Sequence, residues 1–325
     1  MKKIVLWILL IAILMSCAGC TSGSGSMEEQ DNAAAELIAQ QISDAAVRTS
    51  DLLQVTLEEY RKEREAYLPL GNAGELEGRI VIFTVFAGGT DYSWDFSKQE
   101  DLDQKSKCLK DLSEAAAYLT DQAAGYGKNV EFLYDWEADP GLAVEYAAPH
   151  PMANTARTRE IAYELASARK LKETYSADQV IYLFLVNTDY ENTKRSHANS
   201  YEPQKIDGTA SLTDLIEYVK INLRSDYEGE KWDAQSSSYA HEILHLFGVP
   251  DLYKAGTLIP QEYVDHMDAV MSTARYPDIM YGGVSGWSVW NHVFSDVDAY
   301  YAGLTDTCED AEKYVLGKSQ HVTEP

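Results

Sequence analysis

The sequence predicts an α/β fold, which some schemes would class as α+β, built on a largely parallel β-sheet with helices crossing between its strands. Strand-like and helix-like stretches alternate between residues 79 and 186, and such an order places consecutive strands parallel to each other. The run Gln179–Val186 is almost entirely apolar, as expected of a strand buried on both faces. The 325 residues, 45% of them hydrophobic, are enough to bury a large core.

The amino terminus has the pattern of an export signal. Two lysines precede the apolar run Ile4–Met15, which has the length of a signal-peptide core and is too short for a membrane-spanning helix. The run ends in Leu14-Met15-Ser16-Cys17, which resembles a bacterial lipobox. Cys17 would then be lipidated and become the first residue of the mature chain. Cys20 is a competing lipidation site, and simple secretion without a lipid is the alternative.

These signals divide the chain. We expect a lipoprotein signal peptide at residues 1–16, a flexible Ser/Gly tether at 17–31, an N-terminal helical segment at 32–70 and a main domain at 71–325. The helical segment could be a stalk, a remnant of a pro-segment or a helix packed on the main domain. The protein would be an exported, cell-surface lipoprotein anchored to the bacterial membrane.

The main domain begins with a β-branched strand at Arg79–Phe86. Helical periodicity then covers Leu102–Ala124, a strand follows at Val130–Trp136, and a further helix is predicted at Thr155–Tyr175. Residues 211–224 first keep helical spacing and then alternate between apolar and polar. A short helix running into a strand would satisfy both patterns.

The sequence His241-Glu242-Ile243-Leu244-His245 is an H-E-x-x-H motif. On a helix, residues i and i+4 lie one turn apart on one face, so both imidazoles can reach a single Zn²⁺. The apolar residues of this stretch cluster on the opposite side and would face the core; they are Tyr239, Ala240, Ile243, Leu246 and Phe247. The histidines would therefore face a cleft.

The residues that follow would complete the metal site. Gly248 suits the left-handed position that ends a helix, and Pro250 stiffens a turn that would bring Asp251 to the two histidines as third ligand. A catalytic zinc takes three protein ligands and keeps one position open for water. Glu242 would then be the general base that takes a proton from this water. His266 is an alternative third ligand.

This H-E-x-x-H-x-x-G-x-x-D pattern resembles the metzincin clan of zinc endopeptidases, in the variant that has aspartate as third ligand, such as snapalysin. The run Gly248–Tyr253 is similar to immune-inhibitor-A-type peptidases. The resemblance implies that residues 71–325 are a metallopeptidase domain that hydrolyses a protein or peptide substrate with zinc. It also implies a twisted, mostly parallel sheet with an antiparallel edge strand beside the active-site helix, for which Ser196–Tyr201 is the candidate.

Metzincins also have a tight turn with a methionine beneath the metal. The run Pro277–Gly283 looks like this Met-turn and would place Met280 there. In several of these enzymes, the tyrosine that assists the oxyanion stands two residues after the methionine, whereas Tyr281 is adjacent to it. Tyr281 and Tyr253 are therefore both candidate oxyanion stabilisers.

The composition narrows the range of partners. The chain has 52 acidic and 27 basic residues and a formal net charge of −25, which argues against binding to nucleic acid and against a polybasic membrane contact. We expect a monomer that contacts the membrane only through its lipid. The charge could also attract calcium or basic substrates. Cys108 and Cys308 could form a disulfide in an exported protein, or Cys108 could latch the zinc in a latent form.

Two other functions use the same features. A zinc amidase acting on cell-wall peptides would need the same ligands and the same glutamate. A non-catalytic surface lipoprotein could bind a ligand on a peptidase scaffold, although the intact Glu242 favours an enzyme.

Overall fold

The computed structural model covers most of the predicted main domain. The residues that it describes are 74–152, 158, 161, 165, 168–199, 217–227, 229–282 and 288–321. All of them belong to one of the two units into which the chain divides, Thr49–Pro325. The signal peptide, the tether with Cys17 and the helical segment at 32–70 lie outside the described residues and remain predictions.

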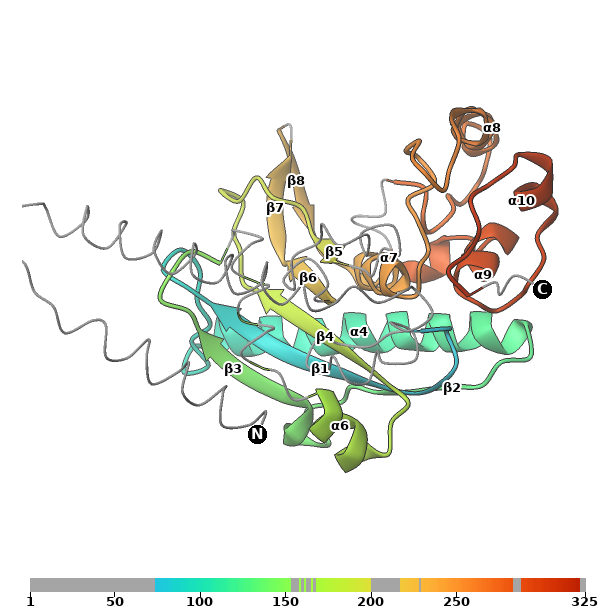
Figure 1. Cartoon of the computed structure of the whole chain (residues 1–325). Helices are drawn as coiled ribbons and strands as arrows, with labels where there is room; N and C mark the ends of the chain where they lie inside the picture. Colours follow the sequence, from blue (N-terminus) through green and yellow to red (C-terminus); the bar gives the residue numbers. More distant parts are fainter. Residues whose placement is uncertain are drawn as a thin grey trace, which may run out of the picture. The chain divides into compact units, whose positions relative to one another are not determined.

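A six-stranded, mostly parallel sheet forms the centre of the fold (Figure 1). Five strands follow the order β2-β1-β4-β6-β5, and β3 pairs with the second half of β1. Strand β5 is antiparallel to β6, whereas the other pairs are parallel. The strands are β1 (Gly78–Gly88), β2 (Val130–Leu133), β3 (Ala143–Ala147), β4 (Gln179–Val186), β5 (His197–Asn199) and β6 (Tyr218–Asn222). The predicted fold class is thereby confirmed, including the antiparallel edge strand.

Helices cover both faces of the sheet, and the alternation of side chains along β4 shows how. Ile181, Leu183 and Leu185 point into the core beneath α4 (Gln99–Gly125) and α7 (Ser236–Leu246). The intervening side chains belong to a second core, on the face covered by α6 (Ala168–Tyr175). Every residue of β4 is buried, and burying one large aliphatic side chain contributes about 1.5–3 kcal/mol. The apolar run therefore becomes the central strand.

Beyond the sheet, the chain builds the surroundings of α7. A hairpin of β7 (Arg224–Tyr227) and β8 (Glu230–Asp233) follows β6 directly and leads into α7. The C-terminal part supplies short helices. Figure 1 shows α8 (Gln261–Met271), α9 (Asp296–Tyr301) and α10 (Glu309–Lys313) to the right of α7. The turn η6 (Val289–Asn291) contacts the start of α7, where the N–H of Val289 donates to Ser236. Among the described residues, no helix has the length and apolar character needed to cross a membrane.

The structure differs from the predicted elements in a few places. The second strand ends at Leu133 rather than Trp136 because the Asp135 carboxylate accepts the backbone N–H groups of Glu137 and Ala138 and makes a turn. Strand β3, the short η3 turn before it (Pro140–Leu142) and the β7–β8 hairpin were not predicted. The helix predicted at 155–175 is described continuously only as α6, and residues 211–216 lie outside the described part.

The two cysteines of the main domain do not form a disulfide. Cys108 in α4 and Cys308 are both buried and both free thiols. Burial raises the pKa of Cys108 to about 11, so the thiolate that would bind a metal is scarce near neutral pH. Cys108 is packed against Tyr239, on the apolar side of α7. This placement does not support a cysteine that latches the zinc.

Candidate metal centre

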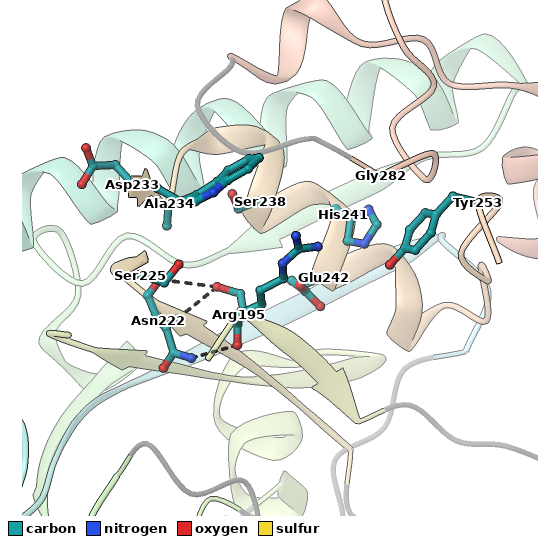
Figure 2. A pocket seen from close by; sticks show the side chains of 12 residues that line it. Arg195, Asn222, Ser225, Asp233, Ala234, Ser238, His241, Glu242, Tyr253 and Gly282 are labelled. Carbon is teal, nitrogen blue, oxygen red and sulfur yellow. Dashed lines mark hydrogen bonds between the residues drawn. The ribbon is translucent and has the colours of Figure 1, made fainter. Parts of the chain in front are cut away.

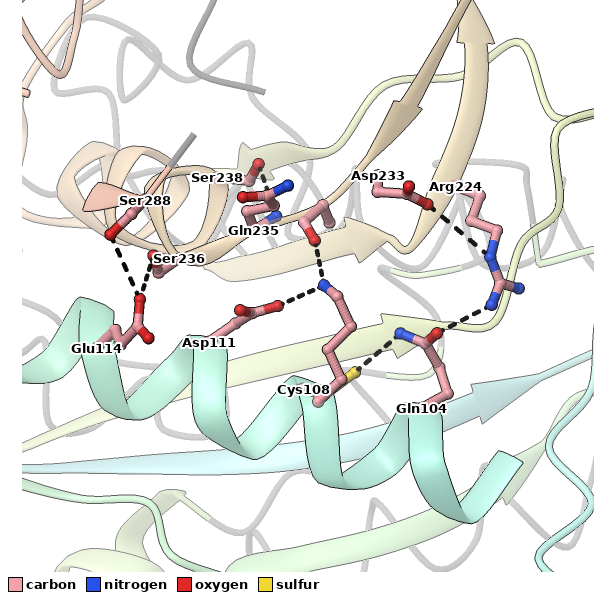
Figure 3. Close-up of polar contacts among 12 residues, drawn as sticks. Gln104, Cys108, Asp111, Glu114, Arg224, Asp233, Gln235, Ser236, Ser238 and Ser288 are labelled. Carbon is pink, nitrogen blue, oxygen red and sulfur yellow. Dashed lines mark hydrogen bonds and ion pairs between the residues drawn. The ribbon is translucent and has the colours of Figure 1, made fainter. Parts of the chain in front are cut away.

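Contacts with α4 fix the beginning of α7 (Figure 3). The Lys107 ammonium donates to the carbonyl of Ala234 at 2.7 Å, and the Ser236 hydroxyl donates to Glu114 at 3.0 Å. Gln235 and Ser238 form a reciprocal capping box at the first turn, which satisfies backbone N–H groups that a helix start otherwise leaves unpaired. The helix that carries the H-E-x-x-H motif therefore starts from a fixed point.

The end of α7 has the geometry that the sequence predicts. Gly248 adopts a φ of 91°. Its N–H donates a hydrogen bond to the carbonyl of His245, and the N–H of Val249 donates one to the carbonyl of Leu244. This pair of hydrogen bonds is the Schellman motif, whose positive φ favours glycine. The chain thus turns sharply after the helix, and Asp251 comes back beside the histidines.

The three predicted ligands converge on one point. The ligand atoms of His241, His245 and Asp251 all lie within 4.8 Å of one another. Asp251 Oδ1 lies 3.4 Å from Nε2 of His241 and 3.4 Å from Nε2 of His245. Ligand atoms about 2.0–2.1 Å from one tetrahedral zinc are separated by roughly 3.4 Å. The spacing of these atoms therefore fits a single small metal ion.

The hydrogen bonds behind the histidines set their tautomer. Nδ1 of His241 lies 2.9 Å from the carbonyl of Ile279, and Nδ1 of His245 lies 2.8 Å from that of Val249. A carbonyl only accepts, so each Nδ1 carries a proton and each Nε2 is the ring nitrogen that can bind a metal ion. Oδ1 of Asp251 is buried and faces both Nε2 atoms at 3.4 Å, so the three atoms surround one point that a cation could occupy.

The pKa values of the ligands reflect the same proximity. Burial alone would raise the pKa of Asp251, but the two imidazoles outweigh it and hold the pKa well below its usual range. Burial would lower the pKa of His245, yet Asp251 and Glu242 raise it to about 9. The carboxylate is therefore ionised at neutral pH, as a metal ligand must be.

The turn that contains Met280 lies directly against the site. The N–H of Tyr281 donates a hydrogen bond to the carbonyl of Asp278, which closes a tight turn. Within this turn, the carbonyl of Ile279 accepts a hydrogen bond from Nδ1 of His241. The side chain of Met280 is fully buried, and its carbonyl accepts the N–H of Leu252 at 2.9 Å. One turn thus supports both a histidine ligand and the segment that carries Asp251.

Glu242 lies next to the ligands and is nearly buried, with 8% of its surface exposed. Burial raises its pKa, and Asp251 adds to the effect, whereas the two histidines and a hydrogen bond from the backbone N–H of Ala198 oppose it. A carboxylate with a raised pKa is a better proton acceptor near neutral pH.

The structure separates the remaining candidates. Tyr253 borders the same cleft as His241 and Glu242, interacts with Asp251 and packs against Gly282, where a Cβ would come within 3.2 Å of its ring. The Tyr281 hydroxyl instead donates to Asp268 at 2.7 Å and does not line that cleft. His266, the alternative third ligand, stacks on Tyr314 with ring centroids 4.9 Å apart.

The cleft beside the metal centre also contains residues that the sequence did not single out. Figure 2 shows Arg195, His241 and Glu242 around one cleft, with the Asn222 amide directed to the main chain of Arg195. The cleft has a volume of about 100 Å³, and Trp232 of the hairpin also lines it. Arg195 directly precedes the predicted edge strand, and this position was the one available signal. Trp232 lies in an unpredicted hairpin.

Two histidines and a carboxylate with room for a further ligand form a donor set that holds zinc in enzymes. The structure shows that the group could hold a metal ion, whose identity it does not define. Comparison of the chain with protein families, curated proteins and solved structures found no match in any of the three.

Proposed function

We propose that the protein is an extracellular zinc-dependent endopeptidase of metzincin type. The main support is the convergence of Asp251 Oδ1 with Nε2 of His241 and His245, together with a buried glutamate beside them. Two histidines and one carboxylate also bind iron in oxygenases. Glu242, placed as a proton acceptor at the site, favours hydrolysis instead.

His241, His245 and Asp251 would hold the zinc, which when bound lowers the pKa of a water molecule and polarises the carbonyl under attack. Glu242 accepts the proton of the attacking water and passes it to the amine that leaves, which is the work of a general base followed by a general acid. Tyr253, at the rim of the cleft, donates its hydroxyl proton in a hydrogen bond to the oxygen that becomes negative. The outer edge of β5 binds the substrate backbone by strand addition.

The place of action follows from the amino-terminal sequence. We propose export, cleavage after Ser16 and lipid attachment at Cys17, with residues 17–31 as a tether. The substrate is then a protein or peptide outside the cytoplasm, and the enzyme acts as a monomer held to the membrane by its lipid.

The test is a comparison of wild type with Glu242→Gln, both loaded with zinc, on an unfolded protein such as casein and on cell-wall fragments. We expect wild type to cut the protein and the variant to retain zinc while losing at least about 100-fold in rate. Equal rates for the two would contradict the mechanism. Cleavage of wall fragments alone would favour the amidase.

A further inference from the structure

Arg195 is placed to bind part of the substrate. Its main chain is fixed, because the Asn222 amide donates to its carbonyl at 2.8 Å. Its guanidinium lies 5.9 Å from the centre of the Trp232 ring, within the range of a cation–π contact. Arg195 and Tyr253 line the same cleft. The guanidinium therefore lies in this cleft, beside Trp232 of the hairpin.

Arg195 is the positive charge of the cleft, whose acidic groups are Asp233 and Glu242. Among the described residues that line it, Arg195 is the single side chain with a fixed positive charge. The Asp233 carboxylate points away from Arg195 in Figure 2. Oδ1 of Asp233 accepts a hydrogen bond from the Tyr190 hydroxyl at 2.8 Å and lies 3.9 Å from Nε of Arg224. Figure 3 draws the contact with Arg224. Glu242 is the base of the proposed reaction.

We infer that Arg195 is a specificity-determining residue that binds a carboxylate of the substrate one or two positions from the bond that is cut. A guanidinium presents paired N–H donors in a plane, which match the two oxygens of a carboxylate. A protein with a net charge of −25 otherwise repels acidic peptides, so a cation beside the reacting bond selects them locally. This inference rests on the proposed peptidase function.

The size of the preference follows from the exposure of the pair. Arg195 is exposed in the free protein, so its ion pair with a bound carboxylate gains more than a fully solvated pair and less than a buried one. We expect a preference of about 5- to 10-fold for an acidic residue over its amide.

The experiment digests a peptide library with the zinc-loaded full chain and reads the residues around each cut by mass spectrometry. Wild type should enrich Asp and Glu at one fixed position. Arg195→Gln should lose this enrichment, because kcat/KM for peptides with Asp or Glu there falls about 5- to 10-fold more than kcat/KM for the matching Asn or Gln peptides. Arg195→Glu should favour Lys and Arg there. Lys194→Gln, a change in the exposed neighbouring residue, is the matched control and should behave as wild type.

Other outcomes overturn the inference. Absence of acidic enrichment in wild type, or equal loss on all peptides in Arg195→Gln, would refute a role in specificity. A further outcome is that cuts lie at a constant distance from the C-terminus of each peptide and disappear when the C-terminal carboxylates are amidated. This result would show that Arg195 binds the C-terminal carboxylate of the substrate and not an acidic side chain.

A binding measurement separates this inference from the proposed function. Immobilised, zinc-loaded Glu242→Gln should retain peptides rich in Asp and Glu, and the additional change Arg195→Gln should abolish that enrichment. Wild type that cuts nothing, combined with this retention, would refute the peptidase and keep the carboxylate site. No acidic enrichment in the retained fraction would refute the site itself.

Discussion

The glycine that ends the active-site helix provides a quantitative test of how the metal centre is built. Gly248 has a φ of 91°, and a non-glycine residue in a left-handed conformation costs about 1–2 kcal/mol. A Cβ at this position would also stand 2.8 Å from Nε2 of Gln320, so that side chain must move. We expect Gly248→Ala to lower the free energy of unfolding of the metal-free protein by about 1–2 kcal/mol or slightly more.

The same change should weaken zinc binding, because Val249, whose carbonyl orients His245, follows Gly248 directly and Asp251 stands three residues after it. Misplacing groups that orient a metal ligand typically costs about 10- to 100-fold in affinity. Urea unfolding measures the stability, and competition with a chromophoric chelator measures zinc affinity.

Gly127 provides a matched control at the end of α4. It has a φ of 76° and forms the same motif, with hydrogen bonds from Gly127 N–H to Ala124 and from Lys128 N–H to Ala123. A Cβ there meets nothing within 4 Å. Gly127→Ala should therefore lose about the same 1–2 kcal/mol and keep the zinc affinity of wild type. If Gly248→Ala binds zinc as tightly as Gly127→Ala does, the turn does not position the ligands as described.

Two further predictions concern the tyrosines and a buried acid pair. Tyr253→Phe should lower the peptidase rate by about 100-fold, whereas Tyr281→Phe, which loses only a hydroxyl bound to Asp268, should stay near wild type; equal effects would reject the assignment of Tyr253. Burial raises the pKa of Asp278 from 3.8 to about 6, and the neighbouring Asp298 is also buried with its pKa raised. The fold therefore holds a proton that the unfolded chain releases, and stability falls as pH rises from about 4 to 6. Asp298→Asn should reduce the difference in the free energy of unfolding between pH 4 and pH 7, measured by urea unfolding of the metal-free protein. An unchanged difference would refute the coupling between the two carboxyl groups.

The metal ligands could be predicted from the sequence because their geometry is local. The spacing of His241 and His245 fixes their relation on any helix, and a glycine followed by a proline gives the turn that returns Asp251. Strand β4 was equally clear, since a strand of eight residues that is apolar after its first, Gln179, has few stable places other than the centre of a sheet.

Other parts depend on contacts between segments that are distant in the sequence. Strand β3 is short and partly exposed, and it forms because the second half of β1 offers an open edge. The carbonyl of Ile279 that orients His241 is a backbone group and leaves no mark in the sequence. Arg195 lines the cleft, and its main chain is held by the amide of Asn222, a residue of a different strand.

The metal content of the purified full-length chain tests the central claim most directly, with His245→Ala measured beside wild type. Elemental analysis after extensive dialysis should give about one zinc per wild-type chain and almost none in the variant, while circular dichroism checks that the variant is folded. Wild type that holds no metal even after incubation with zinc, or a folded variant that holds as much zinc as wild type, would contradict the metal centre described here.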